Sequence, residues 1–125
     1  MNDEVKIIYY QIYLSILLII GVIVSIILNY NTVLDLENKD TLFNKKETLR
    51  ISRYRNFLVL IISILFLYLN YRNKKIAKEK SEDLNAYNLQ ILASIFTIIA
   101  SFIAYYVVLT SSDNETVADI ENPII

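Results

Sequence analysis

Residues 53–75 read RYRNFLVLIISILFLYLNYRNKK, and this stretch decides the fold class. Between Arg55 and Arg72 it contains 16 residues without a charged side chain. An α-helix of that length is about 24 Å long, somewhat shorter than a bilayer's hydrocarbon core of about 30 Å. The flanking arginines can bury their methylene stems and place their guanidinium groups in the headgroup layer. The stretch is therefore predicted to span a membrane as a helix.

Two further stretches also lack charge. The gaps between Lys6 and Asp35 and between Asp83 and Asp113 contain 28 and 29 residues. A soluble amphipathic helix needs a polar face, so its charges recur every turn or two. A soluble three-helix bundle would leave the apolar flanks of these runs in water, and we reject it. The expected fold class is all-α, a small polytopic membrane protein with three transmembrane helices.

The expected organisation is one transmembrane domain followed by a short tail. The domain covers 1–112, with spans at about 7–29, 56–71 and 86–109, a polar loop 31–55 and a basic connector 72–83. The acidic tail 113–125 follows the domain and is expected to be disordered. Part of the polar loop has helical character, and we interpret it as a solvated extension of the second span; the alternative is a helix lying on the membrane surface. Ser81 is expected to cap the third helix.

The composition argues against several functional classes. The chain contains no cysteine and no histidine, which excludes disulfides, thiolate nucleophiles and the usual transition-metal sites. The formal net charge is −1, so no nucleic-acid partner is implied. No charged residue lies inside a span, which argues against a proton relay or an ion-coupled transporter. We expect neither catalysis nor a cofactor. Heavy use of Ile, Asn, Lys and Tyr indicates an AT-rich bacterial genome.

The distribution of Lys and Arg leaves the orientation balanced. With three spans, the N-terminus and the second loop share one side and carry six Lys and Arg residues, and the first loop and the tail also carry six. The positive-inside rule is therefore tied. The α-amino group and the purely acidic tail favour a cytoplasmic N-terminus and an outside C-terminus, in the plasma membrane of a bacterium. Insertion in both orientations is the minority alternative.

Small and amide side chains recur at regular spacing within the predicted spans. Such residues let helix backbones approach closely and form hydrogen bonds between helices, whereas lipid tails offer no hydrogen-bond partner. They are therefore predicted to face protein or a water-filled lumen. The predicted helix-packing or pore-lining residues are Gln11, Ser15 and Ser25 in the first span, Asn56, Ser63 and Asn70 in the second, and Gln90, Ala93, Thr97, Ala100, Ser101 and Ala104 in the third.

Three interpretations of these residues remain open. They hold the three helices of one chain together, they form contacts between the subunits of a homo-oligomer, or they line a hydrated pore. Basic residues at the ends of the second span are predicted to contact lipid headgroups, and these are Arg55, Arg72, Lys74 and Lys75; the alternative is an ordinary topology signal.

The function expected from the sequence is that of a non-catalytic integral membrane protein. It would act as a subunit or scaffold that assembles with itself or with another membrane protein through the polar helix faces. The alternative is an oligomeric pore-forming or holin-like protein that permeabilises the membrane. A membrane enzyme is the least favoured class, because only Lys, Arg, Tyr and carboxylate groups are available for catalysis.

Overall fold

The computed structural model describes residues 2–111, and all the regular structure in this range is helical. The helices are α1 (Asp3–Leu36), α2 (Lys45–Glu79) and α3 (Asn85–Thr110). The expected all-α fold class with three membrane-spanning helices is confirmed, since each helix is long and apolar enough to cross a membrane. The acidic tail predicted at 113–125 lies outside the described residues.

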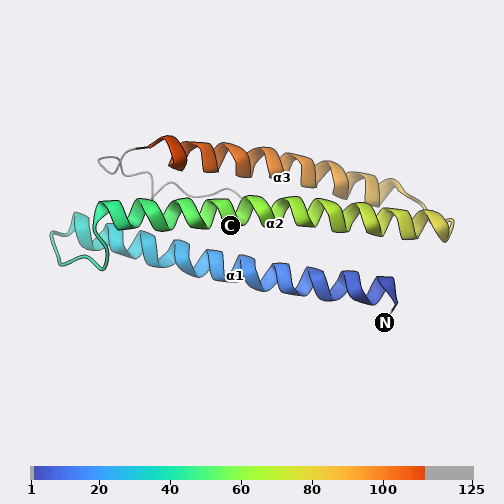
Figure 1. Ribbon diagram of the computed structural model, residues 1–125, viewed down its shortest axis with the longest axis horizontal. Coiled ribbons are helices and arrows are strands. Elements are labelled where there is room, and N and C mark those ends of the chain that lie inside the picture. The colour runs from blue at the N-terminus through green and yellow to red at the C-terminus, as the bar shows by residue number, and fades with distance from the viewer. Residues whose placement is uncertain (1, 112–125) are drawn as a thin grey trace.

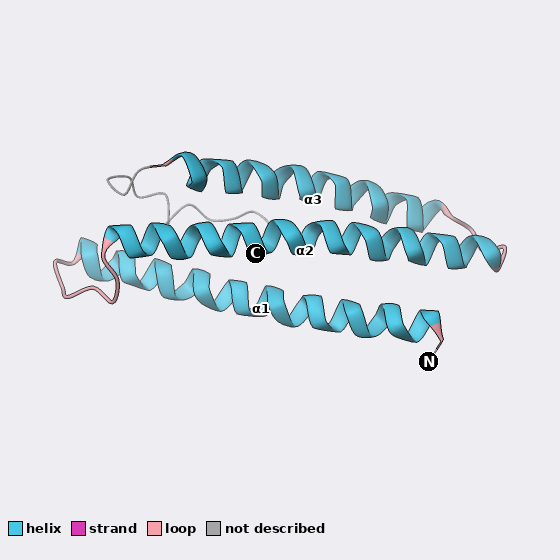
Figure 2. Ribbon diagram, viewed as in Figure 1, coloured by secondary structure: helices cyan, strands magenta, loops and turns pink. Residues whose placement is uncertain are grey.

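The three helices lie side by side and run antiparallel, with α2 in the middle (Figure 1). α2 packs against both α1 and α3, whereas α1 and α3 do not approach each other closely within the described part of the chain. The N-terminus and the α2–α3 turn lie at one end of the molecule, and the α1–α2 loop and the end of α3 lie at the other (Figures 1 and 2). Each helix therefore runs once from one end of the molecule to the other.

α1 and α2 begin before the apolar runs that mark their spans, and a side chain caps the polar N-terminal end of each helix. The Asn2 side chain accepts a hydrogen bond from the Val5 amide at 3.0 Å at the start of α1. α2 begins with a capping box, in which Asn44 and Glu47 each accept a hydrogen bond from the other's backbone amide. Such reciprocal bonds satisfy the free amides of a first helical turn. α2 therefore begins ten residues before Arg55, within the predicted loop, as a continuous extension of the second span.

α1 and α2 end in the same type of turn. Asn38 and Ser81, each the second residue after its helix, have φ values of 56° and 58°. The next amide in each turn bonds back to the helix, Lys39 N to Leu34 O at 2.9 Å and Glu82 N to Ala77 O at 3.0 Å. This is the Schellman arrangement, which usually places glycine at the left-handed position.

The expectation that Ser81 caps the third helix is wrong. Ser81 ends α2 instead, and α3 begins after Leu84 without a side-chain cap. The Asp83 carboxylate accepts a hydrogen bond from the Asn85 amide at 3.1 Å, just before the first turn of α3.

The α1–α2 seam contains the apolar core. Ile7 and Leu14 of α1 form a buried cluster with Ile62 and Leu69 of α2. Both pairs are seven residues apart, the spacing that keeps one face of each helix against its partner in a left-handed pair. Leu28 is fully buried one heptad beyond Gly21 and continues the buried face of α1.

The outward faces of all three helices are apolar. Large side chains such as Ile19, Ile26, Phe96 and Phe102 are more than half exposed. In water this surface would be far larger than the apolar patches that monomeric soluble proteins tolerate. In a membrane these side chains meet lipid tails, so the structure fits a multi-pass membrane protein.

Candidate functional site: polar helix seams and an interfacial groove

The α2–α3 seam is held by hydrogen bonds between hydroxyl and amide groups. Ser63 and Ser101 lie 3.0 Å apart, oxygen to oxygen, and both are buried. The Ser63 hydroxyl also bonds to the Val59 carbonyl at 2.8 Å. A hydroxyl has one proton to donate, so Ser101 is the donor to Ser63. One heptad away, the Asn70 amide donates to the Ser94 hydroxyl at 2.6 Å.

Asn56 and Arg53 occupy the other end of this seam. Asn56 is buried and its amide donates to the Ser52 carbonyl, one turn earlier on α2, at 2.8 Å. Arg53 donates from Nε to the Val108 carbonyl at 3.0 Å and from Nη2 to the Ser111 carbonyl at 2.9 Å. These carbonyls belong to the end of α3, where no further turn can bond to them. Arg53 therefore caps α3 from the neighbouring helix.

Asn31 fixes the loop between α1 and α2. Its side-chain oxygen accepts hydrogen bonds from the amides of Leu42 and Phe43 at 2.8 and 2.9 Å. Its side-chain nitrogen donates to the Phe43 carbonyl at 3.2 Å and to the Thr48 hydroxyl at 3.4 Å. A buried amide that makes this many bonds can hold a loop in one conformation.

The structure distributes the predicted helix-packing residues over three environments. Ser25, Asn56, Ser63 and Ser101 are buried. The half-buried members are Gln11, Asn70, Thr97, Ala100 and Ala104, and the exposed ones are Ser15, Gln90 and Ala93. The α2–α3 seam therefore brings together Ser63, Asn70 and Ser101, with Asn56 one heptad before Ser63 on the same face of α2.

Several of the remaining predicted residues of α3 line a cavity beside this seam. The seam cavity has a volume of about 370 Å³ and receives side chains from all three helices. Its polar wall consists of Ser63, Asn70, Gln90, Ser94 and Thr97, and Leu18 and Phe66 contribute apolar surface. Gln90 and Ala93 face this open space, which explains their exposure. Hydroxyl and amide groups within the membrane-spanning segments find no hydrogen-bond partner among lipid tails.

Sequence reasoning did not single out Asn31, Thr48, Arg53 or Ser94. Ser94 had a usable signal, because it precedes Ser101 by seven residues, the same spacing that links Ser63 to Asn70. Asn31 and Thr48 lie outside the predicted spans, where polar residues are common and do not indicate a buried contact. Their partnership depends on how the loop folds back.

The four residues predicted to contact headgroups lie in different surroundings. Arg55 is only 4% exposed, and its Nε and Nη2 have no hydrogen-bond partner among the described residues. It occupies the heptad position between Thr48 and Ile62, so it points into the α1–α2 seam and differs from the expected headgroup-facing arginine. Arg72 and Lys74 are half-buried, and Lys75 is exposed.

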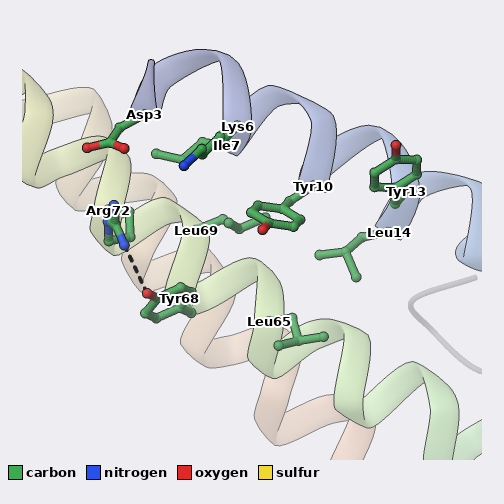
Figure 3. Close-up of a pocket in the computed structure, with 10 residues that line it drawn as sticks. All are labelled: Asp3, Lys6, Ile7, Tyr10, Tyr13, Leu14, Leu65, Tyr68, Leu69 and Arg72. Atoms are coloured by element: carbon green, nitrogen blue, oxygen red, sulfur yellow. Dashed lines mark hydrogen bonds between the residues drawn. The ribbon is translucent and has the colours of Figure 1, made fainter. Parts of the chain in front are cut away.

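Arg72 lies in a groove between α1 and α2, which we call the tyrosine groove. The groove has a volume of about 480 Å³ and is lined by Asp3, Lys6, Ile7, Tyr10, Tyr13, Leu14, Leu65, Tyr68, Leu69 and Arg72 (Figure 3). Arg72 donates from Nη1 to the Tyr68 hydroxyl at 3.0 Å, and its guanidinium carbon lies 5.9 Å from the centroid of the Tyr68 ring. The side chain of Arg72 is thereby held at the mouth of the groove.

An ion pair lies beside this groove. Lys80, just after α2, pairs with Glu4 in the first turn of α1. The hydrogen bond to Glu4 raises the pKa of Lys80 above its ordinary value. Both side chains are about half exposed, so the pair adds little stability.

Within residues 2–111, no group of three or more acidic side chains gathers in a way that could hold a metal ion. Comparison with models of protein families, with curated proteins and with solved structures found no match to this chain. The seams, the cavity and the groove are therefore the features that bear on its function.

Proposed function

We propose that this chain is a non-catalytic integral membrane protein that acts as a subunit or scaffold. The observation that carries the proposal is the seam cavity, which presents Asn70, Gln90 and Thr97 on one side of an otherwise apolar three-helix layer. Buried hydrogen bonds such as Ser63–Ser101 already hold α2 to α3. The polar groups that remain open are therefore available for another membrane protein or a second copy.

The physical reason is the lack of hydrogen-bond partners in lipid. A helix from a partner that enters the cavity can bond to the Gln90 amide and the Thr97 hydroxyl, which acyl chains cannot do. Ala93 lies between these two residues and is small enough to let a partner backbone approach closely. The proposed assembly face is therefore the side of α3 that carries Gln90, Ala93 and Thr97.

Site-directed photo-crosslinking tests this face directly. The chain has no cysteine, so Ala93→Cys introduces a unique attachment point for a benzophenone maleimide. Irradiation in native membranes should give a covalent adduct, with twice the chain's mass if the partner is a second copy. Ile99→Cys, an exposed position on the opposite side of α3, is the matched control and should give none. Equal yields at the two positions, or no adduct at Ala93→Cys, would contradict the proposal.

A pore is the second candidate, because the same polar wall could line a water-filled path. Purified protein in liposomes would then conduct ions, and Asn70→Leu with Gln90→Leu would abolish the current. Asn56→Leu is the control, since Asn56 is a buried amide of the same helix that is not among the residues lining the cavity. A crosslinked assembly without ion flux supports the scaffold, whereas flux that depends on Asn70 and Gln90 overturns it.

The proposed location is the plasma membrane of a bacterium, with the N-terminus and the α2–α3 turn in the cytoplasm. The residue usage and the acidic C-terminal segment support this assignment. The antiparallel layer places the N-terminus and the α2–α3 turn at the same end, which fits the arrangement (Figure 1).

A further inference from the structure

We propose that the tyrosine groove is a binding site for one phospholipid of net charge −1, of the phosphatidylglycerol type. The inference requires only that the helices span a membrane, so it does not depend on the assembly proposed above. The groove opens on the outer surface of the α1–α2 pair, where lipid is the surrounding solvent. Its occupant is therefore a lipid, and the lining residues indicate which one.

The lining changes from charged to apolar along the groove. Lys6 directly precedes the apolar run of α1, and Arg72 directly follows that of α2. Figure 3 shows both at the end of the groove nearest the N-terminus, together with Asp3. From Arg72 to Leu65 is seven residues, or about 10 Å of helix. The charges therefore lie at headgroup depth, and the far end of the groove lies among acyl chains.

A layer of tyrosines separates the two ends. Tyr10 and Tyr68 are 56% and 54% exposed, and they lie about one turn from the charged mouth. Tyrosine is enriched at this depth in membrane proteins, because the ring is apolar and the hydroxyl is polar. Their hydroxyls can donate to ester oxygens of a glycerol backbone. The buried side chains of Ile7, Leu14 and Leu69 form the floor of the groove. Leu14 and Leu65 lie beyond the tyrosines, at the end of the groove that would hold one acyl chain.

The charges at the mouth select the headgroup. Lys6 and Arg72 give two positive charges and Asp3 gives one negative charge, so the net charge is +1. Arg72 uses one donor on Tyr68, which leaves further guanidinium donors for a phosphate oxygen. A phosphodiester with an uncharged alcohol neutralises the site. A zwitterionic lipid would leave the excess positive charge unbalanced, and Asp3 would repel a second negative charge.

Native mass spectrometry of the full-length protein in detergent tests this site. The protein is titrated with phosphatidylglycerol or phosphatidylethanolamine of matched chain length. Phosphatidylglycerol should bind about tenfold more tightly, and the double change Lys6→Gln with Arg72→Gln should remove about that factor. The control is Lys45→Gln with Lys46→Gln, which removes the same charge from exposed positions at the other end of α2, outside the groove, and should change affinity less than about twofold.

Two further variants separate binding from folding. Asp3→Asn should strengthen phosphatidylglycerol binding, a change of opposite sign that damage to the fold would not produce. Leu65→Trp keeps every charge but fills the groove, so it should weaken binding, while circular dichroism checks that the helices persist. Equal losses in both double variants would show that surface charge alone attracts the lipid and would overturn the proposal. Equal affinity for the two lipids would also overturn it.

Discussion

Single hydroxyl and amide groups decide how α2 and α3 meet. Ser63 and Ser101 form their bond where both side chains are buried between the two helices. Bonds between membrane helices are nevertheless modest in strength, because the separated helices also find other partners in the membrane. The serines therefore set the register of the two helices more than their total stability.

The Ser63–Ser101 bond should appear as a coupling in a double-mutant cycle. Ser63→Ala and Ser101→Ala should each lower the free energy of unfolding, and the interaction energy should be about 0.6 kcal/mol. Unfolding in mixed micelles, followed by circular dichroism, measures all three variants. Ser15→Ala, at an exposed hydroxyl of α1, should have no effect. If the effects of the two substitutions simply add, the bond does not form in the micelle-embedded protein.

Arg55 and Arg53 should respond in opposite directions to the same substitution. Arg55→Met removes a buried guanidinium whose Nε and Nη2 have no hydrogen-bond partner among residues 2–111, so it should stabilise the protein by about 1–3 kcal/mol. Arg53→Met should destabilise it, because the Val108 and Ser111 carbonyls lose their donor. The same micelle unfolding assay compares them. Loss of stability in Arg55→Met would reveal a counter-ion for this arginine.

At the scale of elements, the loop between α1 and α2 depends on one side chain. Asn31→Leu removes four hydrogen bonds and should lower the free energy of unfolding by about 1–3 kcal/mol. The amides of Leu42 and Phe43 should then exchange with solvent deuterium much faster, as mass spectrometry of the intact loop peptide would show. Asn29→Leu is the control, because Asn29 is exposed on the same helix. Unchanged exchange in Asn31→Leu would contradict this role.

The turn after α2 stores a small conformational cost. Ser81 has a φ of 58°, a left-handed conformation that glycine adopts without steric penalty. Ser81→Gly should therefore stabilise the protein by about 0.5–1 kcal/mol in thermal unfolding. Asn38→Gly in the equivalent turn of α1 should gain less, since asparagine tolerates this conformation. A loss of stability on Ser81→Gly would mean that the serine side chain makes a favourable contact.

The polar α2–α3 seam was predicted from the sequence, whereas the apolar α1–α2 seam was not. The difference arises because polar residues stand out in an apolar run and apolar residues do not. Asn56, Ser63 and Asn70 stand out at seven-residue spacing because their neighbours are apolar. Ile62 and Leu69 have the same spacing, but they are apolar residues in an apolar run and carry no recognisable pattern. The α1–α2 seam was therefore not predicted, and Arg55 was expected at the surface although its heptad position places it in that seam.

The cavity and the groove also depend on information that no single helix contains. Gln90 and Thr97 were predicted to face protein or water, and the seam cavity that they line needs side chains from all three helices. The tyrosine groove needs Lys6 and Arg72 at one level, which follows from the register of two antiparallel helices. Helix type and approximate spans follow from local composition, whereas these sites follow from packing.

At the scale of the whole molecule, three crossings place the N-terminus and the α2–α3 turn on one side of the membrane. Asp3→Cys and Glu82→Cys report on that side and Asp40→Cys on the other, and all three positions are exposed. In intact bacterial cells, a membrane-impermeant maleimide should label Asp40→Cys only. The reverse pattern would overturn the proposed orientation but keep three crossings. Partial labelling at all three positions would show insertion both ways, which the tied Lys and Arg count permits. Equal, complete labelling would contradict a chain that crosses the membrane three times.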